Sequence, residues 1–455
     1  MKIENDLGRD PIPQLVLRIA LPSMLAQFVS VLYCIVDRMY IGNIPEIGSL
    51  ALAGAGVCGP IVTMVGAVAY LVGTGGSPLM SIRMGSGDND SARSILANCF
   101  LLLCTLSLVL MGVTLATRRP VLLLFGASEA TLPYAMSYYT LYLCGTPFAL
   151  LATGMNQFII CQGYAKKGML SVLLGAVLNI ILDPIFIFGF HLGVAGAAIA
   201  TVLSQIGSCI YVLHFLLGPV PPIRISFGNY NLKLMGKILA MGLTPFTIIV
   251  MDNLMVIGLN ALLQKHGGAA QGDALVAAAT ISQSFMMVVG MPMSGITGGT
   301  SSILGYNYGA GQPARILQAQ KWILGLSLAH TTILCLAGRL IPGLFVGIFT
   351  QDAAVAVLAK EAIRICAIGL IPLAVQYSVV DGFTGMGMIQ YSLPLSVFRK
   401  LVYFIPLFLL PACFGAMATF WAEPISDLFP PIVCAVVYWR RIQYVVGIKP
   451  RKTKA

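Results

Sequence analysis

The sequence predicts an all-α membrane protein with twelve transmembrane helices, arranged as two six-helix lobes. Three observations predict this fold: the composition, the number of long apolar segments and an internal repeat at half the chain length. Of the 455 residues, 58% are hydrophobic and 9% are charged, and the mean hydropathy is +0.89. This composition is typical of proteins that cross a membrane many times and excludes soluble domains.

Twelve apolar segments are long enough to cross a hydrocarbon core of about 30 Å, which takes about 20 helical residues. The strands of a membrane barrel would alternate apolar and polar residues, whereas stretches such as ANCFLLLCTLSLVLMGVTLA show no alternation. Each segment is therefore predicted to be a helix. The expected spans are 15–41, 50–80, 92–116, 133–162, 168–190, 193–216, 237–263, 273–305, 319–341, 358–386, 395–414 and 418–440.

The chain repeats itself at half length. The stretch MGSGDNDSAR at 84–93 reappears as YGAGQPAR at 308–315, so that Gly85 corresponds to Gly309, an offset of 309 − 85 = 224 residues. Six helices in each half return the chain to its starting side. The halves therefore form parallel repeats related by a pseudo-two-fold axis along the membrane normal.

The repeat predicts an N-terminal six-helix lobe over 1–220, a polar cytoplasmic linker over 221–237 and a C-terminal lobe over 238–455 with a basic cytoplasmic tail. With these spans, 20 of the 27 Lys and Arg residues fall on the side of the termini. Cytoplasmic loops carry this excess, so both termini are expected in the cytoplasm of a bacterial cell (inner) membrane protein. The net charge of +11 then reflects topology and attraction to anionic lipid. The positive charge does not imply nucleic-acid binding. Arg118 and Arg119 are the exception to the excess of Lys and Arg on the side of the termini.

Carboxylates inside the apolar segments give the first indication of function. Asp183 lies in LNIILDPIFIFGF, one helical turn after Asn179, and Asp37 lies in VLYCIVDRMYIG, one turn after Tyr33. Residues four apart stack on one face of a helix. A carboxylate at membrane depth is costly unless it is paired, hydrated or protonated, and it commonly marks an ion or substrate pathway.

Three segments resemble hallmark stretches of the multidrug and toxic compound extrusion (MATE) family, closest to its MepA-like bacterial branch. They are LDPIFIFGFHLGVAGAAIATVLSQ at 182–205, GGSPLMSIRMGSGD at 75–88 and SSILGYNYGAGQPAR at 301–315. With the length and the repeat, the resemblance covers nearly the whole chain. It implies a secondary active antiporter that exports amphiphilic, cationic compounds in exchange for Na⁺ or H⁺ by alternating access.

The resemblance also implies a cation site within the N-terminal lobe. Residues at the positions of Asp37, Asn179, Asp183 and Thr201 form such a site in the family, and this sequence has the matching side chains. Two carboxylates, an amide and a hydroxyl are oxygen ligands that suit Na⁺ as the metal. They suit protons equally, because neighbouring carboxylates in a low-dielectric pocket repel each other and favour protonation of one. The sequence leaves both coupling ions open.

Pro184 directly follows the acid and is predicted to bend its helix. Proline has no N–H, and its ring clashes with the carbonyl one turn back, here that of Ile180. A backbone oxygen is left free to bind a cation or water. Binding at Asp183 could therefore be coupled to a bend.

The C-terminal lobe offers two further acids, Asp252 in the seventh predicted helix and Asp381 in the tenth. Some family members carry a coupling acid near the first of these positions, so both are possible second acidic sites. A packing role is an open alternative for each. Arg399 and Lys400 are expected at the cytoplasmic end of the eleventh helix, where they would contribute to the positive-inside bias.

The sequence indicates the substrate-binding residues less clearly. Methionines are flexible and polarizable and suit a cavity that accepts many shapes, although Met at helical spacing also serves ordinary packing. Amides in the helices offer hydrogen bonds. The candidate cavity residues are Asn156, Gln157, Gln283, Met286 and Met287.

Three other function classes fit the sequence less well. A flippase for a lipid-linked saccharide shares the two-lobe plan, but it usually lines its cavity with more basic residues. An intramembrane enzyme requires a metal motif or a nucleophile with a base, and the dispersed eleven Cys and four His show neither. A transport-dead sensor fits poorly with two intact acids. We therefore expect a monomeric transporter, not an enzyme, whose partners are small amphiphilic substrates and membrane lipids, with no cofactor beyond the coupling ion.

Overall fold

The computed structural model describes residues 4–45 and 47–447, and the regular structure of these residues is entirely helical. The N-terminal half contains α1 (Ile12–Gly42), α2 (Gly48–Gly85), α3 (Asn89–Ala116), α4 (Arg118–Leu124), α5 (Leu132–Ile160), α6 (Ala165–Pro184), a short π-helix (Ile185–Gly189) and α7 (Val194–Leu217). The C-terminal half contains α8 (Leu232–Gly309), α9 (Pro313–Leu340), α10 (Pro342–Phe349), α11 (Ala353–Cys366), α12 (Leu370–Gly385), α13 (Ile389–Phe414) and α14 (Ala422–Val445), with 3₁₀ turns at Ala367–Gly369 and Ala416–Trp421.

The twelve-helix prediction is confirmed. Within the described residues, eleven helices are by themselves long and apolar enough to cross a membrane. The remaining predicted span, 358–386, is present as α11 and α12, which a 3₁₀ turn separates. Pro372 stands just after this turn and cannot donate a helical hydrogen bond, so the interruption falls where the sequence weakens the helix.

The helix α8 holds two spans that double back on each other. Its backbone leaves the helical region at Gly268, where φ is 63° and ψ is −169°. Only glycine adopts this conformation readily. The side-chain amide of Gln264 donates to Asp273 Oδ1 at 3.0 Å across the turn, so the two arms run antiparallel as the predicted helices 237–263 and 273–305 require.

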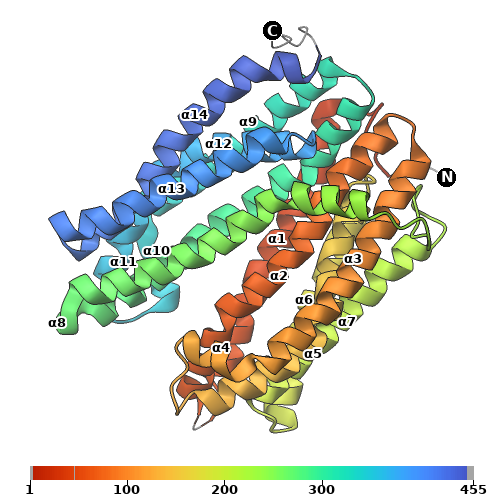
Figure 1. Ribbon diagram of the computed structural model, residues 1–455. Helices are drawn as coiled ribbons and strands as arrows, with labels where there is room; N and C mark the ends of the chain where they lie inside the picture. The colour runs from red at the N-terminus through yellow and green to blue at the C-terminus, as the bar shows by residue number, and fades with distance from the viewer. Residues whose placement is uncertain (1–3, 46, 448–455) are drawn as a thin grey trace.

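Two short helices, α4 and α10, occupy equivalent places in the two halves. Helix α3 ends at Ala116, the predicted boundary, and Arg118 and Arg119 begin α4 as a separate element. The Arg118 guanidinium donates to Thr140 Oγ1 at 3.3 Å. The arginine pair that breaks the charge bias therefore lies in a short connecting helix, at the end of the molecule away from the termini (Figure 1).

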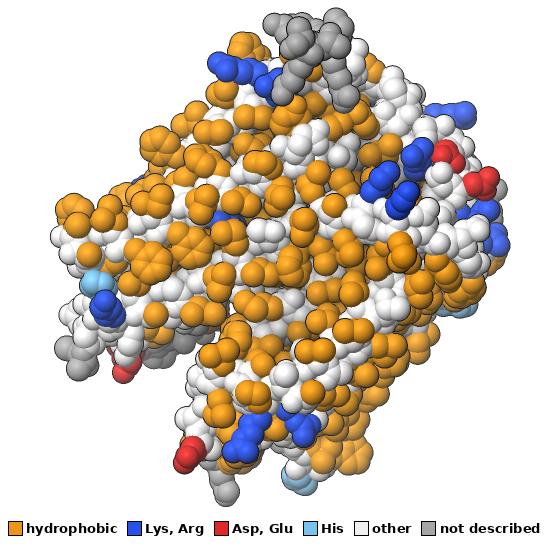
Figure 2. Space-filling model, in the orientation of Figure 1, with side chains coloured by type: hydrophobic (Ala, Val, Ile, Leu, Met, Phe, Trp, Pro, Cys, Tyr) orange, Lys and Arg blue, Asp and Glu red, His pale blue; other side chains and the backbone are white. Residues whose placement is uncertain are grey.

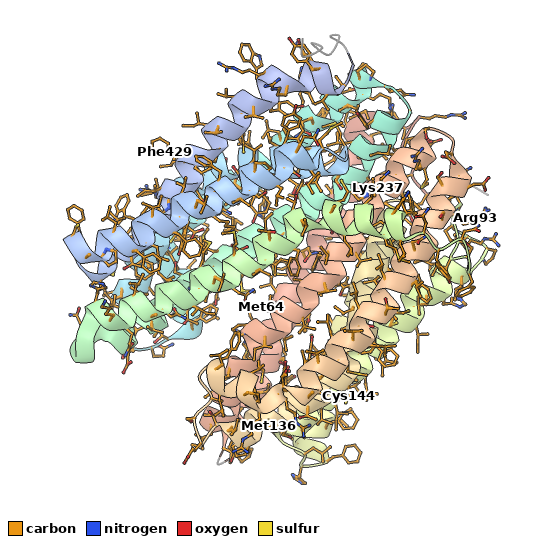
Figure 3. The ribbon with its side chains drawn as sticks, viewed as in Figure 1. Met64, Arg93, Met136, Cys144, Lys237 and Phe429 are labelled. Carbon is orange, nitrogen blue, oxygen red and sulfur yellow. The ribbon has the colours of Figure 1, made fainter. Side chains whose placement is uncertain are left out.

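The two halves form two lobes that meet at one end and diverge toward the other (Figure 1). The N- and C-terminal ends both lie at the end where the lobes meet. Arg93 and Lys237 lie toward this end and Met136 and Cys144 toward the opposite one (Figure 3). Figure 2 shows a hollow between the lobes at the divergent end, and hydrophobic side chains spread over both lobes on the face in view. This multi-pass membrane protein is thus open at one end only.

Close backbone contacts hold the lobes together at the closed end. A Cβ atom added at Gly85 would collide with the carbonyl oxygen of Tyr306, and one added at Gly309 would collide with that of Ile82. The repeat offset relates the two contacts: Gly85 corresponds to Gly309 and Ile82 to Tyr306, because 309 − 85 and 306 − 82 both equal 224. The seal is therefore a pseudo-symmetric pair of glycine contacts across the repeat axis.

The first half of α1 belongs to the packing of the opposite lobe. Ile12, Leu15 and Ile19 are at most 2% exposed and join one buried hydrophobic cluster with Ile303 and Phe383 of the C-terminal half. Between membrane helices such contacts stabilise through close van der Waals packing. The lobes are thus joined by apolar packing as well as by the glycine contacts.

Topology gives a first prediction. A tag inserted after Phe227, in the segment between α7 and α8, should stay inaccessible to impermeant reagents in intact cells, because the Lys and Arg excess lies at that end. A tag at residue 455, which lies outside the described residues, should behave in the same way. A tag at Gln351, between α10 and α11, should be labelled from outside. Labelling of only one of the first two tags would contradict the two-repeat topology.

Candidate functional site

The predicted polar residues of the N-terminal lobe meet between three helices. Helix α6 carries Asn179 and Asp183, which are 2% and 0% exposed. The Asn179 amide donates to Asp183 Oδ1 at 3.2 Å and to Thr201 Oγ1, on α7, at 3.4 Å. The Thr201 hydroxyl in turn donates to the carbonyl of Ala197 at 2.9 Å. The amide thus holds the carboxylate of α6 against the hydroxyl of α7.

The acid of α1 completes this site. The carboxyl groups of Asp37, on α1, and Asp183, on α6, lie close to each other. The fold therefore brings two carboxyl groups together between α1 and α6, where mutual repulsion favours protonation of one of them.

Some oxygens of this acid pair and its neighbour remain free to bind a further ligand. Asp37 Oδ1, Asp183 Oδ2 and Asn179 Oδ1 are buried oxygens that have no hydrogen-bond partner among the described residues. Buried acceptors are normally satisfied, and in this part of the chain neither acid forms an ion pair. Three unsatisfied oxygens on these neighbouring side chains suit a proton or a hard cation such as Na⁺. The donor set fits that ion, with Asp37, Asn179, Asp183 and Thr201 as its possible ligands.

Pro184 marks a change in helix type beside the acid. Regular α-helix ends at Pro184, and the π-helix Ile185–Gly189 continues the segment. The proline leaves the carbonyl of Ile180 without its usual donor. Such π-helical insertions often occur at functional sites, and this one adjoins Asp183.

Tyrosines and a glutamine surround the acid of α1. Tyr33, one turn before it, and Tyr138 of α5 both lie close enough to interact with the Asp37 charge. The rings of Tyr138 and Tyr142 stack with centroids 6.2 Å apart, and Gln205 donates to the Tyr142 hydroxyl at 3.4 Å. Tyr138, Tyr142 and Gln205 were not predicted from the sequence. Their signal was the i, i+4 spacing of Tyr138 and Tyr142, which places two polar aromatic tips on one face of α5.

The C-terminal lobe holds a different arrangement, in which acids are paired with bases. Arg399 donates through Nε and Nη2 to Asp427 Oδ1 at 3.0 and 2.7 Å, and its Nη2 lies 3.5 Å from Glu423 Oε1. Lys400 Nζ forms an ion pair with Asp252. The side chain of Asp252 is 48% exposed, whereas that of Lys400 is 3% exposed. These contacts join α8, α13 and α14.

The prediction that Arg399 and Lys400 lie at the cytoplasmic end of a helix was wrong. Arg399 and Lys400 are 8% and 2% exposed and lie in the middle of α13, inside the lobe rather than at a cytoplasmic helix end. The reason is the acidic residues of α14 and α8, which neutralise them at depth. They therefore do not contribute to the positive-inside bias.

Asp381 faces a cavity of about 50 Å³, which has room for a few water molecules. One oxygen of this acid accepts a hydrogen bond from Thr297 Oγ1 at 2.5 Å. Arg399 and Lys400 line the same cavity, together with Tyr377. Asp381 thus differs from Asp252: it has a hydroxyl partner and no ion pair among the described residues.

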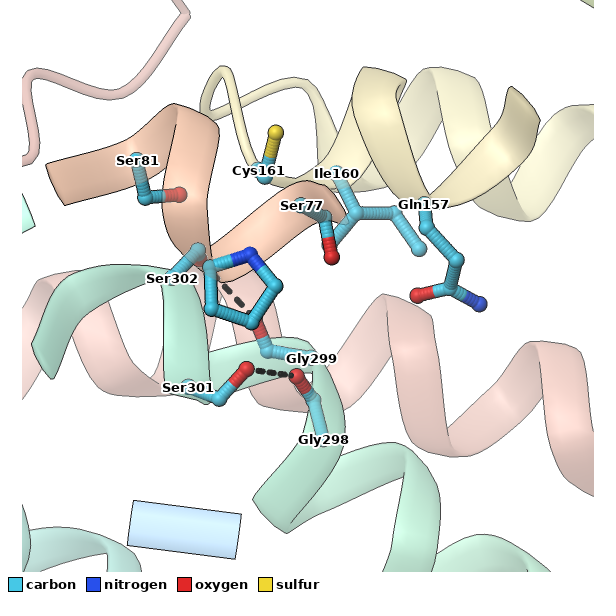
Figure 4. A pocket seen from close by; sticks show the side chains of 10 residues that line it. Ser77, Ser81, Gln157, Ile160, Cys161, Gly298, Gly299, Ser301 and Ser302 are labelled. Atoms are coloured by element: carbon cyan, nitrogen blue, oxygen red, sulfur yellow. Dashed lines mark hydrogen bonds between the residues drawn. The ribbon is translucent and has the colours of Figure 1, made fainter. Parts of the chain in front are cut away.

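The five candidate substrate residues lie in different places. Asn156 is buried and accepts from Ser171 Oγ at 3.2 Å, which places it in packing between α5 and α6. Gln157 lines a small gap between the lobes with serines of α2 and α8 (Figure 4). Gln283 has a buried Nε2 without a partner among the described residues, Met286 packs within the C-terminal lobe, and Met287 is 41% exposed. The structure does not gather them into one pocket.

A two-lobe bundle of twelve membrane-spanning helices, open at one end and with an acid pair buried in one lobe, defines a class of secondary transporters. Comparison with known proteins makes this specific. The sequence matches the MatE family over residues 22–185 and 249–410. The chain therefore belongs to the MatE family, whose members are membrane transporters and not enzymes.

The chain is similar to characterised relatives over almost its whole length. It is 22% identical to the multidrug export protein MepA of Staphylococcus aureus strain NCTC 8325 over 422 residues, which cover 92% of each chain. It is 24% identical to MepA of Staphylococcus haemolyticus, covering 91% of this chain and 90% of that one. The outward-facing structure of a multidrug resistance MATE family transporter superposes with a TM-score of 0.89 at 22% identity, covering 97% and 98% of the two chains. The structural likeness establishes the fold.

Proposed function

We propose that this protein is a cation-coupled antiporter that exports amphiphilic, cationic compounds, with Asp37 and Asp183 as the coupling acids. One observation carries the proposal, the contrast between the lobes. The N-terminal acids lie side by side and form no ion pair with the described residues, whereas Asp252 and Asp427 are ion-paired. An acid whose charge is already neutralised by a basic side chain binds a proton or a metal cation less readily. Coupling therefore belongs to the N-terminal lobe.

Either Na⁺ or H⁺ suits this site. Protonation of the second carboxyl would remove the last negative charge, and Na⁺ could instead take the free oxygens of Asp37, Asp183 and Asn179 with the Thr201 hydroxyl. Both changes alter the contact between α1 and α6 beside Pro184. Cation binding can in this way be linked to a change of helix geometry and so to the position of α1.

The substrate class follows from charge and aromatic content. Asp37 has Tyr33 and Tyr138 in its surroundings. Aromatic faces and a carboxylate together attract organic cations that have apolar bodies. Met64 of α2 projects toward the space between the lobes (Figure 3), where a flexible side chain suits varied shapes. The multidrug export function named for the Staphylococcus relatives agrees with this substrate class.

The flippase alternative finds no support in the C-terminal lobe. A carrier of anionic lipid-linked sugars needs free basic groups in its cavity. Arg399 and Lys400 are the buried bases of this lobe, and both already bind carboxylates. Their charges are therefore not available to a phosphate.

The proposal includes a location and an orientation. The protein would act as a monomer in the bacterial cell membrane, surrounded by lipid that contacts its apolar outer face (Figure 2). With both termini in the cytoplasm, as the Lys and Arg distribution favours, the hollow between the lobes opens to the outside. No cofactor is needed besides the coupling ion.

The direct test is transport by purified protein in sealed vesicles. A fluorescent organic cation should move uphill when a Na⁺ or a proton gradient is imposed, each gradient being applied alone. The gradient that drives movement identifies the coupling ion. Absence of uphill movement under both gradients would overturn the proposed function.

Linkage between the ligands gives a second prediction. Antiport requires substrate and cation to compete at least in part, and coupling between ligands is reciprocal. Lowering the pH from about 8 to about 6 should protonate the remaining carboxylate and weaken binding of a lipophilic cation. Na⁺ should weaken it as well if Na⁺ is the coupling ion. Equilibrium binding of a cationic dye in detergent measures both effects.

The same measurement on Asp183→Asn provides the control, because the variant keeps the size of the side chain and cannot change charge. Its dye affinity should be independent of pH. Wild-type affinity that is independent of both pH and Na⁺ would show that these carboxylates do not couple transport.

A further inference from the structure

The segment before α1 crosses the closed end of the molecule and contacts both lobes. Asn5 is 2% exposed, and its Nδ2 donates to the carbonyl of Gly163 at 2.7 Å, in the turn between α5 and α6. Two residues later the chain reaches the other lobe, where Leu7 is 4% exposed in a cluster that includes Ile316. This short segment thus connects the two lobes, which must separate for the closed end to open.

On the C-terminal lobe, one arginine holds the segment. Arg315 Nη2 donates to the carbonyls of Leu7 at 3.1 Å and Asp10 at 2.9 Å. Its Nε donates to Asn307 Oδ1 at 2.8 Å, and Asn307 Nδ2 donates to the Leu7 carbonyl at 3.0 Å. Arg315 forms no ion pair with the described residues. Its charge is satisfied by the oxygens of the segment and of Asn307, and such charge-assisted bonds are stronger than neutral ones.

The segment has a defined shape of its own. Asp6 Oδ1 accepts from the backbone N–H groups of Gly8 and Arg9 at 3.0 and 3.1 Å, and the Asp6 N–H donates to Asp10 Oδ2 at 3.1 Å. Local bonds of this kind fix a turn before it docks. The carbonyls of Leu7 and Asp10 are thereby presented together to one guanidinium.

A related contact occurs in the other half. The segment before α8 reaches back to α3, where Asn98 Nδ2 donates to the Asn229 carbonyl at 3.3 Å and Asn98 Oδ1 accepts from the Asn231 N–H at 2.9 Å. Asn231 and Leu7 are related by the repeat offset, 231 − 7 = 224. In each half, the residues that precede the first helix are thus held by the third helix of the opposite half, α3 or α9.

We propose that residues 4–11 form a strap that holds the closed end shut, and that Arg315 is the residue that locks the strap. Among the described residues, the strap carries several hydrogen bonds to the C-terminal lobe and one, Asn5–Gly163, to the other helices of the N-terminal lobe. When the Gly85 and Gly309 contacts part, the weaker attachment breaks first. The strap and the first half of α1 then move with the C-terminal lobe.

This proposal rests on alternating access in the proposed function, but its test needs no transport. Spin labels at Ser86 and Gln312, exposed positions at the ends of α2 and before α9, report the distance across the closed end. The exposed Cys144 and Cys413 are first replaced with Ser. Measured without substrate or gradient, the wild type should show one short distance.

Arg315→Gln should add a longer distance and raise the ratio of open to closed molecules by about tenfold or more, because the loss of even one of the three charge-assisted hydrogen bonds that Arg315 donates accounts for a factor of about ten. The matched control is Arg93→Gln, which removes an exposed arginine that pairs only with Asp90, at 3.5 Å. It should leave the wild-type distance unchanged. Equal distance distributions for Arg315→Gln and Arg93→Gln would overturn the proposal.

Asn5→Ala provides an independent variant if Arg315→Gln does not fold. It removes the neutral bond to Gly163 and leaves the C-terminal lobe untouched, so a smaller shift toward the open form is expected. No shift in Asn5→Ala, with Arg315→Gln unfolded, would also overturn the proposal. Because the readout is a distance, failure of ion-coupled export leaves it interpretable, and the two proposals can fail separately.

Discussion

Asp183→Asn and Asp37→Asn should each abolish uphill export. The acid pair has free oxygens for a proton or a cation, and an amide can neither exchange a proton nor carry the charge that attracts Na⁺. Substrate accumulation driven by the ion gradient should fall to the level of vesicles without protein. Protein yield and detergent stability should change little, because asparagine keeps the volume and one acceptor oxygen of each side chain.

The matched control is Asp352→Asn, at the start of α11, where the side chain accepts from the backbone N–H groups of Ala354 and Val355. Asparagine caps a helix as well as aspartate does, so export should be unchanged. If both acid-pair variants still drive uphill export at the wild-type rate, the coupling site lies elsewhere. Asp381, which faces the C-terminal cavity without an ion pair among the described residues, would be the next candidate.

The fold was predictable because the bilayer imposes it. An apolar segment of about 20 residues has one stable conformation in lipid, the helix. Each predicted span is helical at its predicted place, and the repeat at Gly85 and Gly309 correctly indicated two related halves. The break between α11 and α12 was not predicted, because an interruption of three residues, Ala367–Gly369, does not lower the apolar character of the segment.

The candidate site was predictable only within each helix. The i, i+4 spacing placed Asn179 beside Asp183, but no local pattern shows that α1 brings Asp37 to α6. That juxtaposition entered through the family resemblance. Tyr138, Tyr142 and Gln205 were missed for the same reason, because their relation to Asp37 depends on the packing of α5 and α7 against α1.

Arg399 and Lys400 show where a charge count fails. A tally of Lys and Arg assigns each base to a membrane face, and it does not ask whether an acid can neutralise the base at depth. Asp427 lies 28 residues from Arg399, on the next helix, and Asp252 lies 148 residues from Lys400. The contacts of residues 4–11 were not predictable either, because these mixed-charge residues show no pattern that predicts docking against another part of the chain.

Asp427→Leu should strongly destabilise the protein. Asp427 is 0% exposed and supplies the oxygen that Arg399 binds through two nitrogens. The guanidinium cannot lose its proton to avoid an unpaired charge, and Glu423, at 3.5 Å from Nη2, replaces only part of the contact. Removal of one partner of a buried pair costs about 3 to 5 kcal/mol. Thermal unfolding of purified protein in detergent measures the loss.

The double variant Arg399→Met with Asp427→Leu separates the cost of an unpaired charge from the value of the pair itself. Hydrophobic replacement of both partners is often neutral or stabilising, so most of the lost stability should return. Asp90→Asn is the control, because its ion pair with Arg93 is exposed, with side chains 95% and 49% accessible, and contributes little. If Asp427→Leu unfolds at the wild-type temperature, the charge network does not hold α13 to α14, and Arg399 must find its counter-charge elsewhere in the lobe.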